Sequence, residues 1–235
     1  MKLRYFTGIF KTYDLEFISA EKVSEDYVVV KLKAQKPLDW EAGQHGIFTL
    51  PGKKVKGKFF RVFTLASTPE EHTILLGTRT GKTPSAFKQA LLDMKEGEIV
   101  KLRGPGGWFV VKDSTSPIIM LATGVGITPM RAMFYSLKDD ASRPIHLIHS
   151  APDFHLLSDE FKELQKKNKK MELTYVANRE EFKEAIKAVT AQYGSSGYYY
   201  IAGSPHTVAA TRALLKAQGI KRRRSVHESF MGYKQ

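Results

Sequence analysis

The sequence predicts two domains of different class, an antiparallel β-barrel or sandwich followed by an α/β domain built on a parallel sheet. In residues 1–112, short β-rich runs are separated by turn residues, a rhythm typical of all-β domains. In residues 117–235, strand and helix patterns alternate, which indicates parallel strands with helices on both faces of the sheet. The polar stretch from Asp113 to Pro117 has the composition of a linker, so we place the domain boundary there.

The first half contains several strand candidates and one helix candidate. The strands are expected at Lys2 to Phe10, Tyr27 to Lys33, Gly46 to Leu50, Phe59 to Leu65, Thr73 to Thr78 and Ile99 to Leu102. The helix is expected from about Ser85 to Met94, with Thr83 as its N-cap and Pro84 at its first position. Its apolar residues recur on one face, which is typical of a helix that packs on a sheet.

The second half begins with the apolar run from Pro117 to Ala122, which leads through a glycine loop into a helix near Thr128. Further strands are expected at Ile145 to His149, Met171 to Ala177, Tyr198 to Ala202 and Ser225 to His227, and further helices near 158–167, 180–193 and 205–217. In open parallel sheets, ligands bind beyond the carboxyl ends of the strands. Because the loops at Gly124 and Gly203 both follow strands, we expect a ligand site there.

The composition narrows the chemistry that the chain can perform. Of its 235 residues 42% are apolar, enough to bury a core, and 37 Lys and Arg against 24 Asp and Glu give a net charge of +13. Such a surface attracts nucleotides, phosphates or an acidic protein. The absence of cysteine excludes disulfides, Cys-ligated iron–sulfur clusters and thiolate zinc sites. The histidines show no metal-ligand spacing, and no apolar run has the length of a signal peptide or a membrane span. We therefore expect no metal site, no membrane insertion and a cytoplasmic location.

Two short motifs suit the binding of a nucleotide. Gly124-Val125-Gly126-Ile127-Thr128-Pro129 brings backbone amides and a helix N-terminus together after a buried strand, a place for a pyrophosphate, although a tight turn without a ligand stays an alternative. In Arg61-Val62-Phe63-Thr64, the first and third side chains share one face of a strand. A guanidinium there can hold a phosphate while the ring stacks on a planar ligand, and a core Phe beside a surface Arg is the alternative.

Several such motifs follow one another in a definite order along the chain. In the first half they are Ala42-Gly43-Gln44-His45, Arg61-Val62-Phe63-Thr64, Gly81-Lys82-Thr83-Pro84-Ser85 and Gly104-Pro105-Gly106-Gly107-Trp108-Phe109. In the second half they are Gly124 to Pro129, Ala202-Gly203-Ser204-Pro205 and Glu228-Ser229-Phe230-Met231-Gly232-Tyr233. Together the motifs and their order resemble the ferredoxin–NADP reductase superfamily of flavin-dependent electron-transfer enzymes, over nearly the whole chain.

The resemblance implies a six-stranded antiparallel barrel that binds FAD, or FMN, over residues 1–112, and a Rossmann-like domain that binds NAD(P)H over residues 117–235. The flavin contacts that it implies are Arg61, Val62, Phe63, Thr64, Gly81, Thr83, Pro84 and Ser85, with Arg61 on the pyrophosphate, Phe63 on the isoalloxazine and Thr64 near flavin N5. The implied contacts of the pyridine nucleotide are Thr123, Gly124, Gly126, Thr128, Pro129, Ala202, Gly203, Ser204 and Pro205. The candidates for catalysis are Thr64, Glu228, Phe230 and Tyr233. The first two would contact the reduced ring, and the last two would cover the open face of the flavin.

Three departures from the superfamily's motifs have consequences. Phe63 stands in place of the usual Tyr, which keeps the stacking area but loses a hydrogen bond of about 0.5–1.5 kcal/mol. Ala202 stands where many members have a Cys, so either a thiol is not required or hydride transfer is slow. After the second parallel strand, Ser150-Ala151-Pro152-Asp153 lacks the basic residue that members using NADPH often have there. Asp153 can accept from a ribose hydroxyl, which favours NADH. Arg179 and the run from Lys221 to Arg224 can instead serve the 2′-phosphate of NADPH, and the choice stays open at this point.

The implied function is transfer of a hydride from NAD(P)H to bound FAD and of electrons onward to a separate acceptor, such as the acidic carriers ferredoxin or flavodoxin. Two alternatives share this fold, a reductase of free flavin or ferric complexes and a subunit of a larger redox complex. A basic nucleic-acid-binding protein is an alternative from another class. The chain shows neither an aromatic platform for single strands nor a helix-turn-helix signature, so we expect no nucleic-acid partner.

Overall fold

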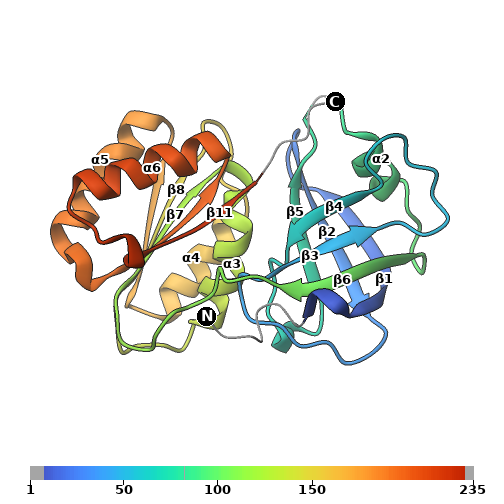
Figure 1. Cartoon of the computed structure of the whole chain (residues 1–235), viewed down its shortest axis with the longest axis horizontal. Coiled ribbons are helices and arrows are strands. Elements are labelled where there is room, and N and C mark those ends of the chain that lie inside the picture. The colour runs from blue at the N-terminus through green and yellow to red at the C-terminus, as the bar shows by residue number, and fades with distance from the viewer. Residues whose placement is uncertain (1–7, 82, 231–235) are drawn as a thin grey trace. The chain divides into compact units, whose positions relative to one another are not determined.

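A computed structural model describes residues 8–81 and 83–230, and only the backbone of residue 9. The chain forms two compact units, one ending at Val110 and the other beginning at Val111 (Figure 1). Each unit has a sheet and a hydrophobic core of its own. Within the described part of the chain, no helix combines the length and the apolar character that crossing a membrane requires.

The first unit is a six-stranded antiparallel sheet that curls into a nearly closed barrel. Its strands are β1 (Thr12–Lys22), β2 (Tyr27–Ala34), β3 (His45–Thr49), β4 (Phe60–Thr64), β5 (Ile74–Arg79) and β6 (Ile99–Gly106), in the order β4-β3-β6-β1-β2-β5. The edge strands β4 and β5 meet just beyond β4, where the Ala66 amide donates to the Leu75 carbonyl at 2.8 Å. Alternate side chains point into the barrel, as the pleat of a strand requires, and form one apolar cluster. The fold class expected for this half is confirmed.

The first strand does not lie where the sequence analysis placed it. Gly8–Phe10 form a 3-10 turn (η1), and the earlier part of the expected strand lies outside the described residues. β1 instead uses Thr12–Lys22, in which buried and more exposed side chains alternate through Leu15 and Phe17. The expectation was wrong because it followed the aromatic and apolar residues near the N-terminus. A strand with one face in water also accepts acidic residues at every second position.

The helix of the barrel unit, α2 (Ala86–Leu92), begins later than the sequence analysis expected. Ser85 is its N-cap, not Thr83. The backbone of Ser85 is extended, at φ −63° and ψ 155°, and its Oγ accepts from the Lys88 amide at 3.5 Å. This bond satisfies a helix amide that has no partner within the helix. Pro84 therefore precedes the helix and does not occupy its first turn.

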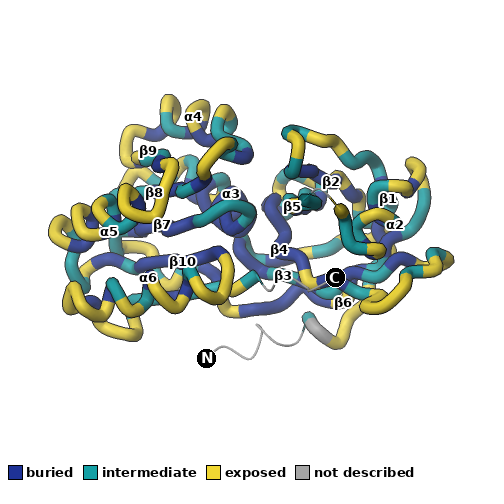
Figure 2. Tube along the Cα trace, turned by 90° about the horizontal axis from the view of Figure 1, so that it is seen from above, coloured by how far each residue is buried: buried dark blue, intermediate teal, exposed yellow. Residues whose placement is uncertain are grey.

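The second unit is a five-stranded parallel sheet between two layers of helices. Its strands, in the order β11-β10-β7-β8-β9, are β7 (Ile118–Thr123), β8 (Ile145–Ser150), β9 (Met171–Val176), β10 (Tyr198–Gly203) and β11 (Ser225–Ser229). The helices are α3 (Ile127–Ser136), α4 (Ser158–Lys167), α5 (Arg179–Tyr193) and α6 (Pro205–Ala217). Figure 2 shows β7 and β10 buried inside this unit and the outward turns of α4, α5 and α6 exposed. The expected alternation of strands and helices is confirmed.

The two faces of this sheet are covered by different helices. Ile119 and Leu121, two residues apart on β7, belong to one apolar cluster with Phe182 of α5. α3 and α4 pack against each other through Phe134 and Phe161, whose ring centroids lie 5.2 Å apart. Because successive side chains of a strand point to opposite faces, β7 is buried on both sides. A ligand that approaches β7 is therefore expected at the loops beyond its ends.

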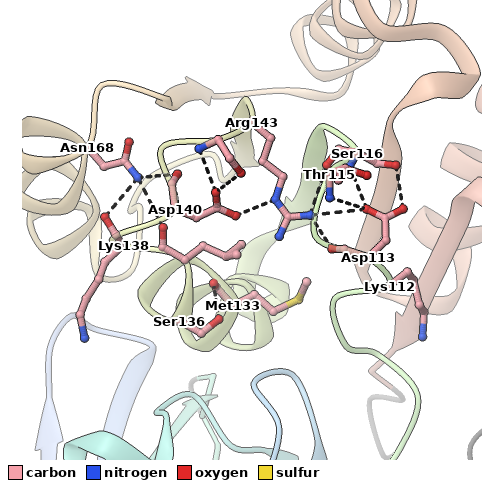
Figure 3. Close-up of polar contacts among 12 residues, drawn as sticks. Lys112, Asp113, Thr115, Ser116, Met133, Ser136, Lys138, Asp140, Arg143 and Asn168 are labelled. Carbon is pink, nitrogen blue, oxygen red and sulfur yellow. Dashed lines mark hydrogen bonds and ion pairs between the residues drawn. The ribbon is translucent and has the colours of Figure 1, made fainter.

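The stretch that follows Val111 is a structured turn and not a loose linker (Figure 3). Asp113 Oδ1 accepts from the amides of Thr115 and Ser116, at 3.1 and 2.8 Å. The buried Arg143 donates to the Asp113 carbonyl at 2.5 Å and to the Asp140 carboxylate at 2.7 Å. Burial tends to raise the pKa of Asp113, but the hydrogen bonds from Ser116 and Thr115 and the charge of Arg143 lower it overall. These contacts connect the segment before β7 with the loop between α3 and β8.

Candidate functional site

In the barrel unit, the structure brings Arg61 and Ser85 together. Arg61 is 5% exposed, and its Nη2 donates to Ser85 Oγ at 3.1 Å. Its Nη1 donates to the carbonyls of Lys58 and Phe60, at 2.8 Å each. Its Cζ lies 5.3 Å from the centroid of the Phe87 ring. The guanidinium is therefore held in one orientation beside the start of α2, an arrangement that suits an anion.

The segment before α2 contains the other predicted residues of this motif. Gly81 has φ +66°, which favours glycine, and a Cβ built there meets nothing within 4 Å. Thr83 is exposed and Pro84 is half-buried. On the first turn of α2, burial and then the charge of Arg61 lower the pKa of Lys88. Two cationic groups so close together are stabilised by an anion beside them.

Phe63 lies in the apolar core of the barrel. Its ring centroid is 5.7 Å from that of Phe48 in an edge-on pair and 6.3 Å from that of Phe87. Phe63 is 9% exposed, whereas its neighbour Val62 is 39% exposed. The ring is therefore part of the core in this structure, and its stacking on a flavin stays a prediction.

Thr64 has a buried hydroxyl, Oγ1, with no hydrogen-bond partner among the described residues. Since buried hydroxyls are nearly always paired, this one fits a position that a ligand completes. Thr64 pairs across the sheet with His45, at the end of the motif 42–45. A Cβ at Gly43, whose φ is +96°, would lie 2.0 Å from the carbonyl oxygen of Phe109. The motifs 42–45 and 104–109 therefore pack directly on each other near Thr64.

In the second unit, the two glycine loops meet at the carboxyl ends of the neighbouring strands β7 and β10. A Cβ at Gly126 would lie 2.2 Å from the carbonyl oxygen of Ala202, and a Cβ at Gly203 would lie 2.3 Å from Thr123 Oγ1. No side chain fits at either position. Gly124, with φ +51°, opens a 3-10 turn (η3, Gly124–Gly126) that leads directly into α3. The result is two tightly packed loops at a helix N-terminus, a place that suits phosphate groups.

The remaining predicted nucleotide contacts fall into two groups. Ser204 and Pro205 are exposed and open α6, with Ser204 as N-cap accepting from a first-turn amide at 3.2 Å. Thr128 and Pro129 are buried in the first turn of α3, and the Thr128 hydroxyl donates to the Val125 carbonyl at 3.0 Å. Ser204 and Pro205 therefore lie at the surface of the sheet edge. Thr128 and Pro129 are buried and stabilise the Gly124 loop.

Two of the predicted catalytic residues lie beside the Gly203 loop. Glu228 pairs in register with Ala202, and the Phe230 amide donates to the Gly203 carbonyl at 2.9 Å. Tyr233 lies outside the described residues, and Thr64 belongs to the barrel unit. The predicted residues gathered at this one sheet edge are Thr123, Gly124, Gly126, Ala202, Gly203, Ser204, Pro205, Glu228 and Phe230.

The sequence analysis missed a cluster of rings beside the Gly124 loop. His149, fully buried in β8, has its Nε2 3.0 Å from the Gly124 carbonyl oxygen and its Nδ1 3.1 Å from Nδ1 of His155. The His155 ring lies 4.6 Å from that of Tyr175 in β9. Burial lowers the pKa of His149 to about 4, so the ring is neutral at neutral pH. His149 and Tyr175 stand near the carboxyl ends of two expected strands, and that shared position was the signal available in the sequence.

No group of three or more His, Asp or Glu side chains that could hold a metal ion occurs within residues 8–81 and 83–230.

Comparison with known proteins gives matches along the chain. Residues 120–212 match the family of oxidoreductase NAD-binding domains. A flavohemoprotein of Bacillus cereus is 29% identical over 151 residues, which cover 57% of this chain and 37% of that protein. The toluate 1,2-dioxygenase electron transfer component of Pseudomonas putida is 24% identical over 232 residues, 93% of this chain and 67% of that protein. The chain thus spans little more than a third of the length of the flavohemoprotein.

A solved structure shares the fold over most of the chain. The ferredoxin NADP+ reductase from Neisseria gonorrhoeae, with bound FAD and NADP, superposes with a TM-score of 0.76 at 17% identity, over 93% of this chain and 98% of that one. The fold implied by the order of the motifs is thereby confirmed. The chain has the fold of that reductase, and its residues 120–212 match the family of oxidoreductase NAD-binding domains.

Proposed function

We propose that this chain is an NAD(P)H-dependent FAD oxidoreductase that passes electrons to a separate acceptor. The observation that carries the proposal is the meeting of the two glycine loops, where neither Gly126 nor Gly203 leaves room for a Cβ. This close packing places the two loops and the N-terminus of α3 together at the carboxyl edge of a parallel sheet, where a pyrophosphate can bind backbone amides. The reductase from Neisseria gonorrhoeae, which binds FAD and NADP on the same fold, supports both cofactors.

The barrel unit contains groups that fit FAD. Arg61 and Ser85 would hold its pyrophosphate, because two carbonyls already orient the guanidinium toward the Ser85 hydroxyl. The hydroxyl of Thr64, buried and without a partner in the described part of the chain, would bond the edge of the flavin ring. When bound, FAD supplies the ability to take up two electrons at once and release them in one or two steps.

Among the pyridine nucleotides we favour NADH. The run from Lys221 to Arg224 precedes β11 and therefore lies at the amino end of the sheet, where Arg224 Nη1 donates to Ser116 Oγ at 3.0 Å. The glycine loops lie at the opposite edge, about 16 Å away along a strand of five residues. This separation argues against the run as a ligand of the 2′-phosphate. Asp153 follows β8 at the carboxyl edge and would accept from ribose hydroxyls, and Arg179 is the basic alternative there.

We propose an acidic electron-carrier protein as the acceptor. The chain has a net charge of +13, and the loop between β3 and β4 exposes Lys54, Lys56 and Lys58. Next to them Phe59 is 64% exposed. A positive surface with an apolar centre suits a partner that carries carboxylates. The relative from Pseudomonas putida, named as an electron transfer component, supports a role of this kind.

Absorbance spectroscopy tests the proposed reaction. The purified chain is expected to show flavin bands, or to acquire them with FAD, and to lose them on anaerobic addition of NADH, more slowly with NADPH. A protein that takes up neither FAD nor FMN would contradict the proposal. The cytoplasmic location expected from the sequence stays a prediction that cell fractionation tests.

Turnover with different acceptors tests the proposed partner. Because salt screens charges, reduction of a ferredoxin or flavodoxin should slow at high salt, whereas reduction of free flavin should not. The double variant Lys54→Glu/Lys56→Glu should raise KM for the protein carrier. Lys183→Glu/Lys187→Glu on α5 is the control with the same change in net charge. Faster turnover with free flavin or ferric complexes at every salt concentration would instead identify a reductase of small molecules.

A further inference from the structure

The buried ring of His149 joins the Gly124 loop to the loop that follows β8. Its Nε2 lies 3.0 Å from the Gly124 carbonyl oxygen, and its Nδ1 lies 3.1 Å from Nδ1 of His155. The ring is 0% exposed, so these two bonds satisfy both of its polar atoms away from water. The His155 ring packs edge-on against it, with centroids 4.9 Å apart.

These partners determine which nitrogen of His149 carries the proton. A carbonyl oxygen only accepts, so Nε2 must carry the hydrogen that bonds Gly124. Burial lowers the pKa of His149 to about 4, so at neutral pH its Nδ1 carries a lone pair. Nδ1 of His155 is then the donor to it. His155 thereby fixes the tautomer of His149 that can bond the glycine loop.

The groups around the two histidines keep them neutral at neutral pH. Burial, with the charge of Lys162 on α4, lowers the pKa of His155. Burial, with the charge of Asp159 on α4, raises the pKa of Tyr175 to about 12. The Tyr175 hydroxyl lies 3.4 Å from the Ser158 carbonyl. The hydrogen-bond chain from His155 to Gly124 is therefore intact at pH 7 and above.

The bond to Gly124 sets the orientation of a peptide group in the loop. Gly124 adopts φ +51°, and glycine has more backbone freedom than any other residue. The carbonyl of Gly124 accepts from His149 and from the Ile127 amide. In a planar trans peptide the carbonyl and the following N–H point in opposite directions. When the carbonyl of Gly124 is held toward His149, the N–H of Val125 points away from it.

We propose that His149 is a positioning residue for nucleotide binding, which holds the Gly124 peptide so that the Val125 amide faces the phosphates of NAD(P)H, with His155 fixing its tautomer. The proposal rests on the proposed function, because it assigns the loop to a pyridine nucleotide. His149 contacts the loop and not the reacting atoms, so it should affect nucleotide affinity more than the rate of the chemical step.

The first test reads the proton on His149 without any nucleotide. Long-range nitrogen–proton NMR of the whole chain at pH 7 should show His149 neutral, with its proton on Nε2. In His155→Phe, which keeps a ring but loses the donor, both tautomers should appear. A charged His149, or a proton on Nδ1 in the unaltered chain, would overturn the assignment.

The second test measures nucleotide affinity. His149→Phe keeps a buried ring and loses both hydrogen bonds, so the Kd for NADH should rise about 3- to 10-fold, with kcat and flavin content unchanged. His149→Gln, whose amide can still donate to the Gly124 carbonyl, should recover most of the affinity. His155→Phe should lie between. The control is His146→Phe on the same strand. Because the His146 ring bonds Thr174, the Kd of this variant for NADH should match that of the unaltered chain.

The outcomes separate the two proposals. If the unaltered chain binds neither NADH nor NADPH, the proposed function fails and the positioning role fails with it, while the NMR spectra still report the tautomer. If the unaltered chain binds NADH and folded His149→Phe binds it equally well, the positioning role alone is wrong. Should His149→Phe not fold, His155→Phe decides, because an unchanged Kd in that variant overturns the proposal.

Discussion

The two units build their candidate sites by opposite means. In the barrel unit the site consists of side chains, since Arg61 is oriented by two carbonyls and bonds Ser85. In the parallel-sheet unit the site consists of backbone, since Gly126 and Gly203 let chain segments approach more closely than a Cβ allows. The first site should therefore be sensitive to the loss of a functional group. The second should be sensitive to the gain of a single carbon atom.

The difference follows from the two kinds of sheet. In the barrel unit a side chain on a strand supplies the functional group, because Arg61 on β4 reaches Ser85 at the start of α2. A parallel sheet gathers its loops and helix N-termini at one edge, so the ligand meets backbone amides. Both tryptophans of the chain, Trp40 and Trp108, belong to the barrel unit. Tryptophan fluorescence therefore follows the barrel, while circular dichroism mainly follows the helices of the second unit.

The largest effect is expected for Gly126→Ala. The added Cβ would lie 2.2 Å from a backbone oxygen, so the loop or β10 must shift. Overpacking of this kind should lower the free energy of unfolding of the second unit by about 3 kcal/mol. Urea unfolding followed by circular dichroism should show this loss, and the tryptophan transition should not move.

Gly219→Ala is the matched control for that variant. Gly219 has φ +77°, but a Cβ there meets nothing within 4 Å. Its substitution should cost about 1–2 kcal/mol, from the left-handed backbone alone. If the two variants lose equal stability, the close approach of the two loops does not constrain the second unit.

Acid should destabilise the second unit before the barrel. The pKa of His149 is about 4 in the folded chain and near 6.5 in the unfolded chain, so between these values the unfolded state binds more protons. Stability is therefore lost as pH falls from about 6.5 to about 4, by about 2–3 kcal/mol. Unfolding at several pH values, followed by circular dichroism, measures it.

Two features sharpen this pH dependence. Asp113 and Asp140 also lie in the second unit, and their pKa values in the folded chain are lowered. Both carboxylates therefore stabilise the unit at neutral pH, and this stabilisation is lost only near and below their ordinary pKa of 3.8. His149→Gln removes the ring with the largest shift and should make the profile shallower between about pH 6.5 and 4, while His146, His155 and His227, whose pKa values burial also lowers, keep part of the slope. An equal acid shift of the tryptophan transition would mean that His149 is not the origin.

The sequence predicted regular elements better than contacts between them. The bounds of α4 and α6 follow from helical periodicity, with Ser204 as the N-cap of α6, and both helices lie where they were expected. Thr83 and Ser85 are both residue types that can cap a helix. In the structure Ser85 is the N-cap of α2, and its hydroxyl also accepts a hydrogen bond from Arg61, 24 residues away in the sequence. His155 reaches His149 only because the loop after β8 folds back. No local sequence pattern indicates that the chain folds back in this way.

A smaller effect is expected for Arg61→Ala. A hydrogen bond to a charged group contributes about 1.5–3 kcal/mol, so flavin affinity should fall about 10- to 100-fold. Flavin retained after gel filtration and titration with FAD measure it, and the affinity of the second unit for NADH should not change. Arg79→Ala is the control, since Arg79 is exposed and forms a surface ion pair with Asp26. Loss of flavin from both variants would show that general charge, and not the oriented guanidinium, holds the cofactor.

The smallest effect is expected for Thr64→Val, and its sign differs between the free and the flavin-bound chain. Without flavin the Thr64 hydroxyl is buried and unpaired among the described residues, so its removal should leave the free energy of unfolding unchanged or raise it by about 1 kcal/mol. With FAD, loss of one hydrogen bond should weaken binding about 2- to 10-fold.

Thr128→Val provides the contrast in the second unit, because the Thr128 hydroxyl donates to the Val125 carbonyl. That variant should lose about 1 kcal/mol of stability without any ligand. Together the two variants distinguish a hydroxyl that stabilises the folded chain from one that is available to bond a ligand. If Thr64→Val destabilises the flavin-free barrel as much as Thr128→Val destabilises its unit, Thr64 bonds the protein itself, and the side-chain site of the barrel reduces to Arg61 and Ser85.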